Sequence, residues 1–284
     1  MIGVLGHGYL GTRLAADLPG AVLLHVDIAD RAAVLASLRE HGCTAVVNAA
    51  GKTGFPNVDW CEDHAFETFR SNVTGALVVA EAAAELGVYL LHLGSGCIFY
   101  GPSPSPGGWR EDDFANPVSL YSRSKYAADL MLSRLPNVGI ARLRMPIDGA
   151  PAPRNLITKL VGYAQVIDVE NSVTVIDDMV VAVRELVGHR AQGIFHVTNP
   201  GVLRHRELLE GYRELVDPLH RCELVDEAEL EKRGLVRAAR SNCILQSSRL
   251  AARGIVLRPV HEALRDALTR YAAARKGIAQ VAEL

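Results

Sequence analysis

Tyr121, Lys125 and Ser95 are the side chains of this chain best suited to protonating a carbonyl oxygen. Tyr121 and Lys125 open a stretch of helical periodicity and lie four residues apart, which places them on one face of a helix. A phenol is a weak acid at neutral pH, and a neighbouring ammonium lowers its pKa. We therefore expect Lys125 to lower the pKa of Tyr121. Ser95, which follows an apolar run upstream, would hydrogen-bond the same carbonyl oxygen.

Gly6, Gly8 and Gly11 indicate what delivers hydride to that carbonyl carbon. They form the spacing G-x-G-x-x-G between a short apolar run and a helical stretch. The glycines permit a tight turn and close approach of the backbone to a pyrophosphate, which then lies at the helix N-terminus. The pattern predicts a nicotinamide dinucleotide, whose ribose Lys125 would hold. The residues predicted to bind it are Gly6, Gly8, Tyr9, Leu10, Gly11, Asp27, Ile28, Ala49, Ala50, Gly51, Tyr121 and Lys125.

Asp27 bears on the choice between NADH and NADPH. It follows the second apolar run, where a carboxylate would accept hydrogen bonds from the adenosine ribose and repel a 2′-phosphate. That position favours NADH. Arg13 and Arg31 lie near it in the sequence and could offset its charge, so the cofactor is predicted as NADPH or NADH.

A parallel sheet is needed to bring these residues together. Short apolar runs at residues 2–5, 22–26, 45–48, 88–93 and 138–143 alternate with stretches of helical period. Such alternation indicates a sheet covered by helices on both faces. We expect an α/β, Rossmann-type doubly wound parallel sheet with the active site at the carboxyl ends of its strands. Residues 100–120, rich in Pro, Gly and Asp, indicate a surface or lid segment.

The character of the chain changes after Met145. Pro146, Pro151 and Pro153 interrupt it, and shorter elements follow. Residues 193–198 resemble another sheet strand, residues 204–216 are helical, and Pro259 opens a last helix that reaches about Lys276. We expect residues 1–145, with 173–200 returning, to form the dinucleotide-binding domain. Residues 146–172 and 201–284 would form a smaller substrate-binding lobe.

Composition excludes several classes of protein. The chain has 284 residues, 49% of them hydrophobic, and Lys+Arg 30 against Asp+Glu 32 gives a net charge of −2, which disfavours nucleic-acid binding. No apolar run approaches the roughly 18 to 20 residues of a membrane span, and no signal peptide is expected. The five cysteines are scattered and never in C-x-x-C spacing, so no metal site or disulfide framework is predicted. A reduced, cytoplasmic protein is the expectation.

Longer motifs resemble a known family. Residues 51–62 read GKTGFPNVDWCE, and further matching stretches are RLRMPI at 142–147, PRNLITK at 153–159, NSVTV at 171–175 and TNPGV at 198–202. The chain resembles the extended short-chain dehydrogenases/reductases, in the branch that contains dTDP-4-dehydrorhamnose reductase and GDP-fucose synthase. Within it, these motifs are most similar to the UDP-4-keto-6-deoxy-glucose 3,5-epimerase/4-reductase family of UDP-rhamnose synthesis.

The resemblance implies a set of site residues. The family's reductase residues fall on Ser95, Tyr121 and Lys125, and its epimerase pair falls on Cys97 and Lys159. Arg240, in RSN at 240–242, matches a position near the nucleotide diphosphate, where a guanidinium fits phosphate oxygens. The substrate-binding residues implied in this way are Asn57, Ser95, Asn155, Asn171, Arg240 and Asn242. Asn72 matches a family asparagine with a mainly structural role.

The implied activity is 3,5-epimerisation and 4-keto reduction of a nucleoside-diphosphate 4-keto-6-deoxy-hexose. Both hydrogens to be exchanged are α to the ketone, and inversion needs a base on one face and an acid on the other. Phe55 and Lys52 depart from the family motif at the substrate side. The alternatives are a reductase alone, a non-redox epimerase, or a non-catalytic regulatory subunit. The expected partner is the sugar nucleotide, and a homodimer is compatible with the sequence.

Overall fold

Six parallel strands form the central sheet. The computed structural model describes residues 1–55, 57–226, 229, 232–233 and 241–282. The strands are β1 (Ile2–Leu5), β2 (Ala21–Leu24), β3 (Ala45–Asn48), β4 (Tyr89–Ser95), β5 (Val138–Leu143) and β10 (Gly193–Val197). Their order is β10-β5-β4-β3-β1-β2, and each neighbouring pair is parallel. The order reverses between β1 and β3, which is where such sheets bind ligands. The predicted fold class is confirmed.

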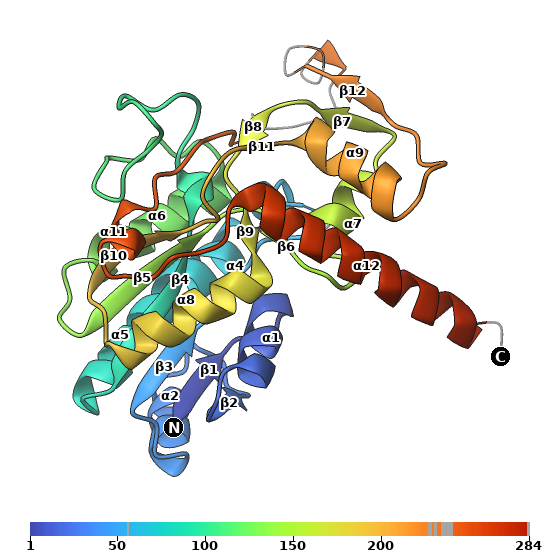
Figure 1. Cartoon of the computed structure of the whole chain (residues 1–284). Coiled ribbons are helices and arrows are strands. Elements are labelled where there is room, and N and C mark those ends of the chain that lie inside the picture. The colour runs from blue at the N-terminus through green and yellow to red at the C-terminus, as the bar shows by residue number, and fades with distance from the viewer. Residues whose placement is uncertain (56, 227–228, 230–231, 234–240, 283–284) are drawn as a thin grey trace.

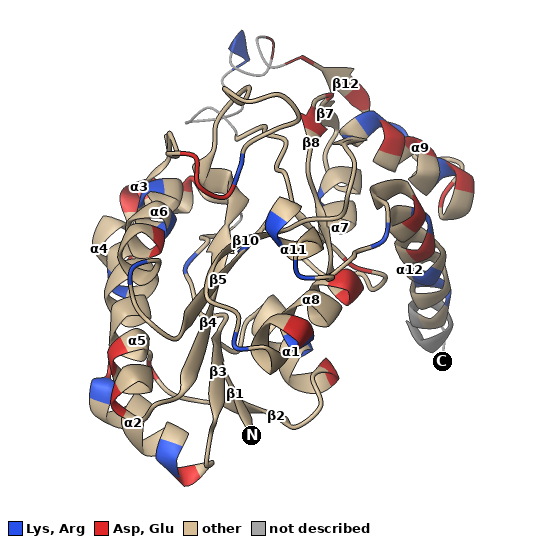
Figure 2. Ribbon diagram, turned by 60° about the vertical axis from the view of Figure 1, so that its left-hand side comes forward, with Lys and Arg blue, Asp and Glu red and all other residues tan. Residues whose placement is uncertain are grey.

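Helices cover both faces of the sheet (Figure 2). One face carries α1 (Tyr9–Asp17) and α8 (Ile176–Gly188); the other carries α2 (Arg31–Glu40), α5 (Gly75–Glu85) and α6 (Leu120–Leu132). Two apolar clusters seal them, one on each face. The strands are apolar along their whole length because both faces are buried.

Short elements connect the strands to these helices. Between β3 and α5 lie α3 (Trp60–Asp63), α4 (Ala65–Phe69) and a π-helical turn, η1 (Arg70–Thr74). A 3₁₀ turn, η2 (Gly96–Ile98), directly follows β4. Single π turns inside helices occur frequently at functional sites, and η1 carries Asn72.

A second group of elements forms the lobe beside the carboxyl edge of the sheet (Figure 1). Its elements are β6 (Pro146–Ile147), α7 (Leu156–Val161), β7 (Gln165–Ile167), β8 (Glu170–Asn171), β9 (Thr174–Val175), β11 (Leu203–Arg204), α9 (His205–Leu215), β12 (Glu223–Val225) and α12 (Val260–Ala282). A separate apolar cluster joins α7, α9 and α12. The division differs from the predicted one in two places. Val173 and Val175, expected in the dinucleotide-binding domain, pack in the lobe cluster. Residues around α11 (Ser248–Ala251), with Leu250, Ile255 and Leu257, pack with the sheet.

Charged side chains tie the lobe to the sheet. Arg13 on α1 pairs with Asp148, which follows β6, at 3.0 Å, and with Asp177 on α8 at 2.6 Å. On α12, Arg270 pairs with Asp177. The ion-pair chain therefore runs from the first helix of the fold to the last.

Residues 100–120 are anchored and do not form a free lid. Trp109 is buried against Cys243 and Leu245, and its backbone exchanges hydrogen bonds with Ile244 and Gln246, each at 2.8 Å. The buried Glu111 accepts hydrogen bonds from Ser248 and Arg249. Most of residues 100–120 are exposed or half-buried, as expected of a surface segment, and the buried Trp109 and Glu111 anchor it. In the described part of the chain, no helix is long and apolar enough to cross a membrane.

Candidate active site

The glycine turn after β1 is shaped for an anionic ligand. Gly6 adopts φ 98°, and a Cβ there would lie 2.5 Å from the backbone nitrogen of Ala50. A Cβ on Gly11 would lie 1.7 Å from the Gly6 oxygen, whereas space is open around Gly8. Gly8 caps α1 without a side-chain acceptor, and the first turn carries no acidic residue. The amide groups at this helix end are thus free of internal side-chain competitors, which fits a dinucleotide pyrophosphate.

The other predicted cofactor residues surround this turn in different ways. Ala49 and Ala50 lie half-buried against Gly6, and Leu10 packs on the sheet cluster. Ile28 is buried among the helices of the opposite face, so its side chain supports the second strand's end. Tyr9 donates its hydroxyl proton to Asp148 at 2.9 Å, and burial with the adjacent carboxylate raises the pKa of Tyr9. The side chain of Tyr9 therefore joins the sheet to the lobe.

Asp27 lies exposed after β2, as a ribose-reading carboxylate would. Its charge partner differs from the expected ones. Arg70 on η1 donates to it at 2.6 Å, while Arg31 pairs with glutamates on α5 and Arg13 with Asp148. A hydrogen bond from the Ala29 amide, with Arg70, lowers the pKa of Asp27. The carboxylate is accordingly ionised at neutral pH.

Tyr121, Ser95 and Cys97 meet at the carboxyl end of β4. Ser95 ends the strand with its hydroxyl near the Tyr121 phenol, and the Cys97 amide donates to Ser95 Oγ at 3.2 Å. Ser119 caps α6, and Ser122 donates to the Cys97 carbonyl at 2.8 Å. This bond fixes the start of α6 on the turn that carries Cys97.

Lys125 was expected to lower the pKa of Tyr121, but in the structure this pKa is raised. Burial raises the pKa of Tyr121, with Cys97 adding to the rise and the nearby Ser95 hydroxyl opposing it. Lys125 is also buried, and its ammonium donates to the Leu93 carbonyl at 2.8 Å and lies 3.1 Å from His92 Nε2. Burial lowers the pKa of Lys125 to about 8, against the attraction of Asp129. The lysine is thus held beneath the strand end by backbone and imidazole.

Asn72 joins the loop after β3 to α6. Its amide donates to the Lys52 carbonyl and to Ser124 Oγ, each at 3.0 Å, and its oxygen accepts from the Lys52 amide at 2.7 Å. Gly51 and Lys52 are thereby placed next to the helix that carries Tyr121 and Lys125. This is the structural role that the sequence indicated.

The lobe supplies Lys159 from the last turn of α7. Burial, then the nearby Arg154, lowers the pKa of Lys159, and the thiol of Cys97 opposes that fall. Lys159 and Cys97 therefore lie within electrostatic range, although they are 62 positions apart in the chain. The guanidinium carbon of Arg154 lies 6.0 Å from the centre of the Phe55 ring. Phe55, which departs from the family motif, therefore borders the region around Lys159.

Two of the implied substrate contacts are internal supports instead. Asn155 is fully buried, caps α7 through the Ile157 amide, and donates to the Asp148 and Ala150 carbonyls. Asn171 is fully buried and its oxygen accepts from Arg144 at 2.5 Å and from the Cys243 amide at 3.0 Å. Neither amide has a surface left for a ligand, so the expectation of direct contact is wrong for both.

The remaining implied contacts are placed differently. Asn57 is half-buried and holds a turn by accepting from the Asp59 amide at 2.8 Å. Asn242 accepts from Asn171 at 3.3 Å. Arg240 lies outside the described residues. Roles in substrate binding for Asn57, Asn242 and Arg240 stay predictions.

Sequence reasoning missed two buried polar residues of this region, His92 and Arg144. His92 lies inside β4, where burial and Lys125 hold its pKa well below the usual range. Arg144 follows β5 and donates to the Cys97 sulfur at 2.8 Å. The available signal was a charged or imidazole side chain within an apolar run, since such residues are rarely buried without a partner.

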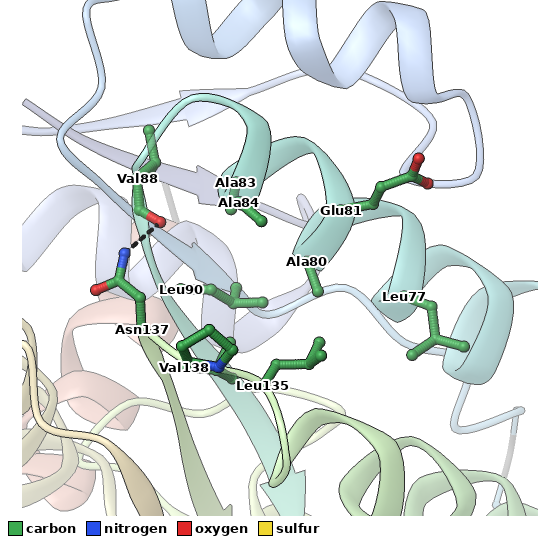
Figure 3. Close-up of a pocket in the computed structure, with 11 residues that line it drawn as sticks. Leu77, Ala80, Glu81, Ala83, Ala84, Val88, Leu90, Leu135, Asn137 and Val138 are labelled. Carbon is green, nitrogen blue, oxygen red and sulfur yellow. Dashed lines mark hydrogen bonds between the residues drawn. The ribbon is translucent and has the colours of Figure 1, made fainter.

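An apolar groove lies at the opposite edge of the sheet (Figure 3). It encloses about 250 Å³ between α5 and the amino ends of β4 and β5, and Asn137 closes one side by donating to the Val88 carbonyl. None of the candidate catalytic residues lines it. The candidate catalytic residues therefore lie away from this groove.

Comparisons with known proteins match nearly the whole chain. The family model for the RmlD substrate-binding domain matches residues 5–273. A bifunctional dTDP-4-dehydrorhamnose 3,5-epimerase/dTDP-4-dehydrorhamnose reductase of Arabidopsis thaliana is 38% identical over 241 residues, which cover 83% of this chain and 79% of the relative.

Solved structures agree with that match. The UDP-rhamnose synthase L780 of Acanthamoeba polyphaga mimivirus has a TM-score of 0.87 and 26% identity, covering 95% of this chain and 99% of the other. The dTDP-4-dehydrorhamnose reductase of Bacillus anthracis, in complex with NADP, has a TM-score of 0.78 and 22% identity, covering 95% and 96%. The second likeness establishes the fold.

Proposed function

The chain belongs to the RmlD substrate-binding-domain family, and from that premise we propose a bifunctional enzyme, a nucleotide-sugar 3,5-epimerase/4-ketoreductase. Its substrate would be a nucleoside-diphosphate 4-keto-6-deoxy-hexose, as in rhamnose-type deoxysugar synthesis. One observation carries the proposal. Ser95 and Cys97 share the turn that faces Tyr121, and Lys159 faces that turn from the lobe.

The reduction half uses Ser95, Tyr121 and Lys125. When bound at the glycine turn, NADH or NADPH would supply the hydride. Tyr121 donates its phenolic proton to the ketone oxygen, and Ser95 hydrogen-bonds the same oxygen. The raised pKa of Tyr121 keeps the phenol protonated at neutral pH, which is the form that reduction consumes. In this proposal Lys125 would hold the nicotinamide ribose and offset the charge of the tyrosinate that remains.

The epimerisation half uses Cys97 and Lys159. One group removes a proton from carbon 3 or carbon 5, and the C–H electron pair moves into an enolate whose oxygen is held by Ser95 and Tyr121. The other group returns a proton to the opposite face, which inverts the centre. The lowered pKa of Lys159 brings its amine form closer to neutral pH, as a proton-transfer group requires.

Deuterium incorporation tests this proposal. The protein is incubated in heavy water with a 4-keto-6-deoxy-hexose linked to UDP or dTDP, without NAD(P)H, and carbons 3 and 5 are followed by NMR. We expect deuterium at both, and none with Cys97→Ser or Lys159→Met. Addition of NAD(P)H to the wild type should then give the 6-deoxy-hexose product.

Tyr121→Phe is the matched variant for the other half. It should lose reduction by about 100-fold or more and lose exchange by less, because reduction requires its proton whereas the enolate oxygen keeps the hydrogen bond from Ser95. If the wild type reduces a pre-epimerised substrate but shows no deuterium exchange, the protein is a ketoreductase without epimerase activity. Binding of coenzyme with neither reaction on any of these sugars would contradict the enzyme assignment.

We also propose a reducing, cytoplasmic location and a homodimer. Cys43, Cys61, Cys97, Cys222 and Cys243 are all free thiols. Several large apolar side chains are exposed on α4 and α6. No role in nucleic-acid binding is proposed.

A further inference from the structure

Arg144 is a buried cation that has no carboxylate partner among the described residues. Its side chain is 1% exposed. Two positions earlier, the equally buried Arg142 donates to Asp129 at 2.8 Å, which is the usual compensation for a buried guanidinium. A buried charge without a counter-charge is costly, so the position of Arg144 calls for an anion that is formed or bound there.

The donors of Arg144 identify the group that takes this charge. Nη1 donates to Cys97 Sγ at 2.8 Å, and Nη2 donates to Asn171 Oδ1 and to the Ser241 carbonyl. Nε is buried and has no hydrogen-bond partner in the described part of the chain. The neutral acceptors hold the guanidinium in place, and the sulfur is the one bonded acceptor that can become negative.

The backbone next to Arg144 is arranged for this contact. Met145 adopts φ 41°, in the left-handed region that side chains other than glycine rarely adopt. Such strain costs about 1 to 3 kcal/mol and clusters at functional sites. At this residue the chain leaves β5 for the lobe, and the turn leaves Arg144 at the carboxyl edge, against η2.

We propose that Arg144 is a positioning residue that stabilises the negatively charged sulfur of Cys97 during 3,5-epimerisation. The proposal rests on the proposed function for its reaction. If Cys97 is the base, the guanidinium holds the thiolate before it takes the carbon-bound proton. If Cys97 is the acid, the guanidinium holds the thiolate after the proton has moved to the enolate carbon. In both directions one proton moves between the sulfur of Cys97 and the ring carbon, so that one of the S–H and C–H bonds forms as the other breaks. Arg144 stays protonated throughout.

Other groups face Cys97 and must be separated from the effect of Arg144. Tyr121 on α6, Lys159 on α7 and the buried thiol of Cys243 all lie within electrostatic range of Cys97. Arg144 also lies within electrostatic range of Cys243. Of these described groups, Arg144 is the one that hydrogen-bonds the sulfur itself. The test therefore changes Arg144 and leaves the others in place.

Alkylation of Cys97 by iodoacetamide measures the thiolate directly in the ligand-free protein. Mass spectrometry follows the modified peptide across pH, with Cys97→Ser as the blank. In Arg144→Met we expect the midpoint of reactivity to move up by about one pH unit or more, since an opposite charge at this distance favours the charged form to that extent. The control for a general disturbance of this strand end is Arg142→Lys. If Arg144→Met does not fold, Arg144→Gln carries the same test, because it also removes the charge.

The activities give the second measurement. Deuterium exchange should fall by about 100-fold in Arg144→Met, the loss typical for removal of one donor to a developing anion. Reduction of a pre-epimerised 4-keto sugar should fall far less. An unchanged alkylation midpoint in a folded variant would overturn the proposal, as would a midpoint shift of the same size in Arg142→Lys. If the wild type shows no exchange, the proposed function fails, while the alkylation result still decides the contact between Arg144 and Cys97.

Discussion

At the scale of single residues, the carboxyl edge of the sheet concentrates polar side chains that burial makes costly. Lys125, His92 and Arg144 are all 4% exposed or less. Lys125 hydrogen-bonds His92 and the Leu93 carbonyl, and Arg144 donates to the sulfur of Cys97. Residues of this kind are retained for chemistry at the expense of stability, since apolar substitutes would pack without desolvation.

Replacement of Lys125 by Met should stabilise the fold at neutral pH. In the folded protein its pKa is about 8, below the unfolded value of 10.5, so both states are protonated at pH 7 and the folded state carries the desolvation cost. That cost disappears as pH rises from 8 to 10.5, so the stability of the wild type rises across this window. The advantage of Lys125→Met over the wild type should therefore shrink by about 3 kcal/mol between pH 7 and pH 10.5.

Urea unfolding at several pH values measures this difference. The exposed Lys232 supplies the control, because Lys232→Met should show no such pH dependence. A constant difference between Lys125→Met and the wild type would mean that the ammonium is not destabilised by burial.

Asp27 should set the preference between the two coenzymes. Its ionised carboxylate at the end of β2 disfavours a 2′-phosphate, and Arg70 is free to meet that phosphate once Asp27 is gone. Asp27→Ser should shift the kcat/KM ratio toward NADPH by about tenfold, equivalent to about 1.4 kcal/mol. Asp112→Ser, on the distant loop, is the control. An unaltered ratio would place the ribose away from Asp27.

The sequence predicted the positions of some site residues and not the contacts of others, and the difference has a physical reason. Ser95, Tyr121 and Lys125 stand at a strand end and a helix start, so local pattern alone brings them to one edge. Asn171 and Asn155 carry the same polar chemistry as a ligand-binding amide, and only the fold shows that both are consumed by Arg144 and by the start of α7. The partner of Asp27 was likewise mistaken, because Arg70 is brought there by η1 and not by sequence proximity.

At the scale of elements, a capped helix, a capped turn or a strand end holds each of the candidate catalytic side chains. Ser119 caps α6 and Asn155 caps α7. Because α7 has only six residues, its cap decides whether Lys159 is held toward the site. The apolar strands were predicted within about two residues, since a two-sided buried strand has an unambiguous composition. The anchoring of residues 100–120 depends on contacts with residues 243–246, which no local pattern reports.

Asn155→Ala should lower epimerisation more than reduction. Loss of the cap costs about 1 kcal/mol of stability and frees the start of α7, so Lys159 loses its fixed orientation. Deuterium exchange should fall several-fold more than reduction of a pre-epimerised substrate. Glu207→Ala removes the side-chain hydrogen bond to the Arg204 amide at the start of α9, and it should leave the ratio of the two activities unchanged. Equal loss in both activities for Asn155→Ala would contradict this role.

At the scale of the whole molecule, the sheet and the lobe are joined by ion pairs on one side and expose apolar surface on another. Phe66 on α4 is 92% exposed and Met131 on α6 is 58% exposed, and α4 packs against α6. We propose that a second copy of the chain covers these exposed side chains, since exposed apolar groups favour such contacts.

Phe66→Asp together with Met131→Asp should convert a dimer to a monomer. The charge would be buried without a partner in the interface, which costs several kcal/mol. Light scattering after size exclusion gives the mass directly. Phe114→Asp is the control, since Phe114 is also exposed but lies on the loop before α6. A monomeric wild type, or equal loss in the control, would contradict the assignment of this surface.

The hydrogen bond from the Cys97 amide to Ser95 Oγ bears on whether the epimerised ketone leaves the site before it is reduced. It makes the two half-reactions neighbours on a single turn, so an epimerised ketone already stands where its reduction takes place. A sugar ring that exchanges its hydrogens there need not re-enter bulk water before it becomes an alcohol. We expect that an added scavenging ketoreductase of opposite stereochemistry would intercept little of it while NAD(P)H is saturating.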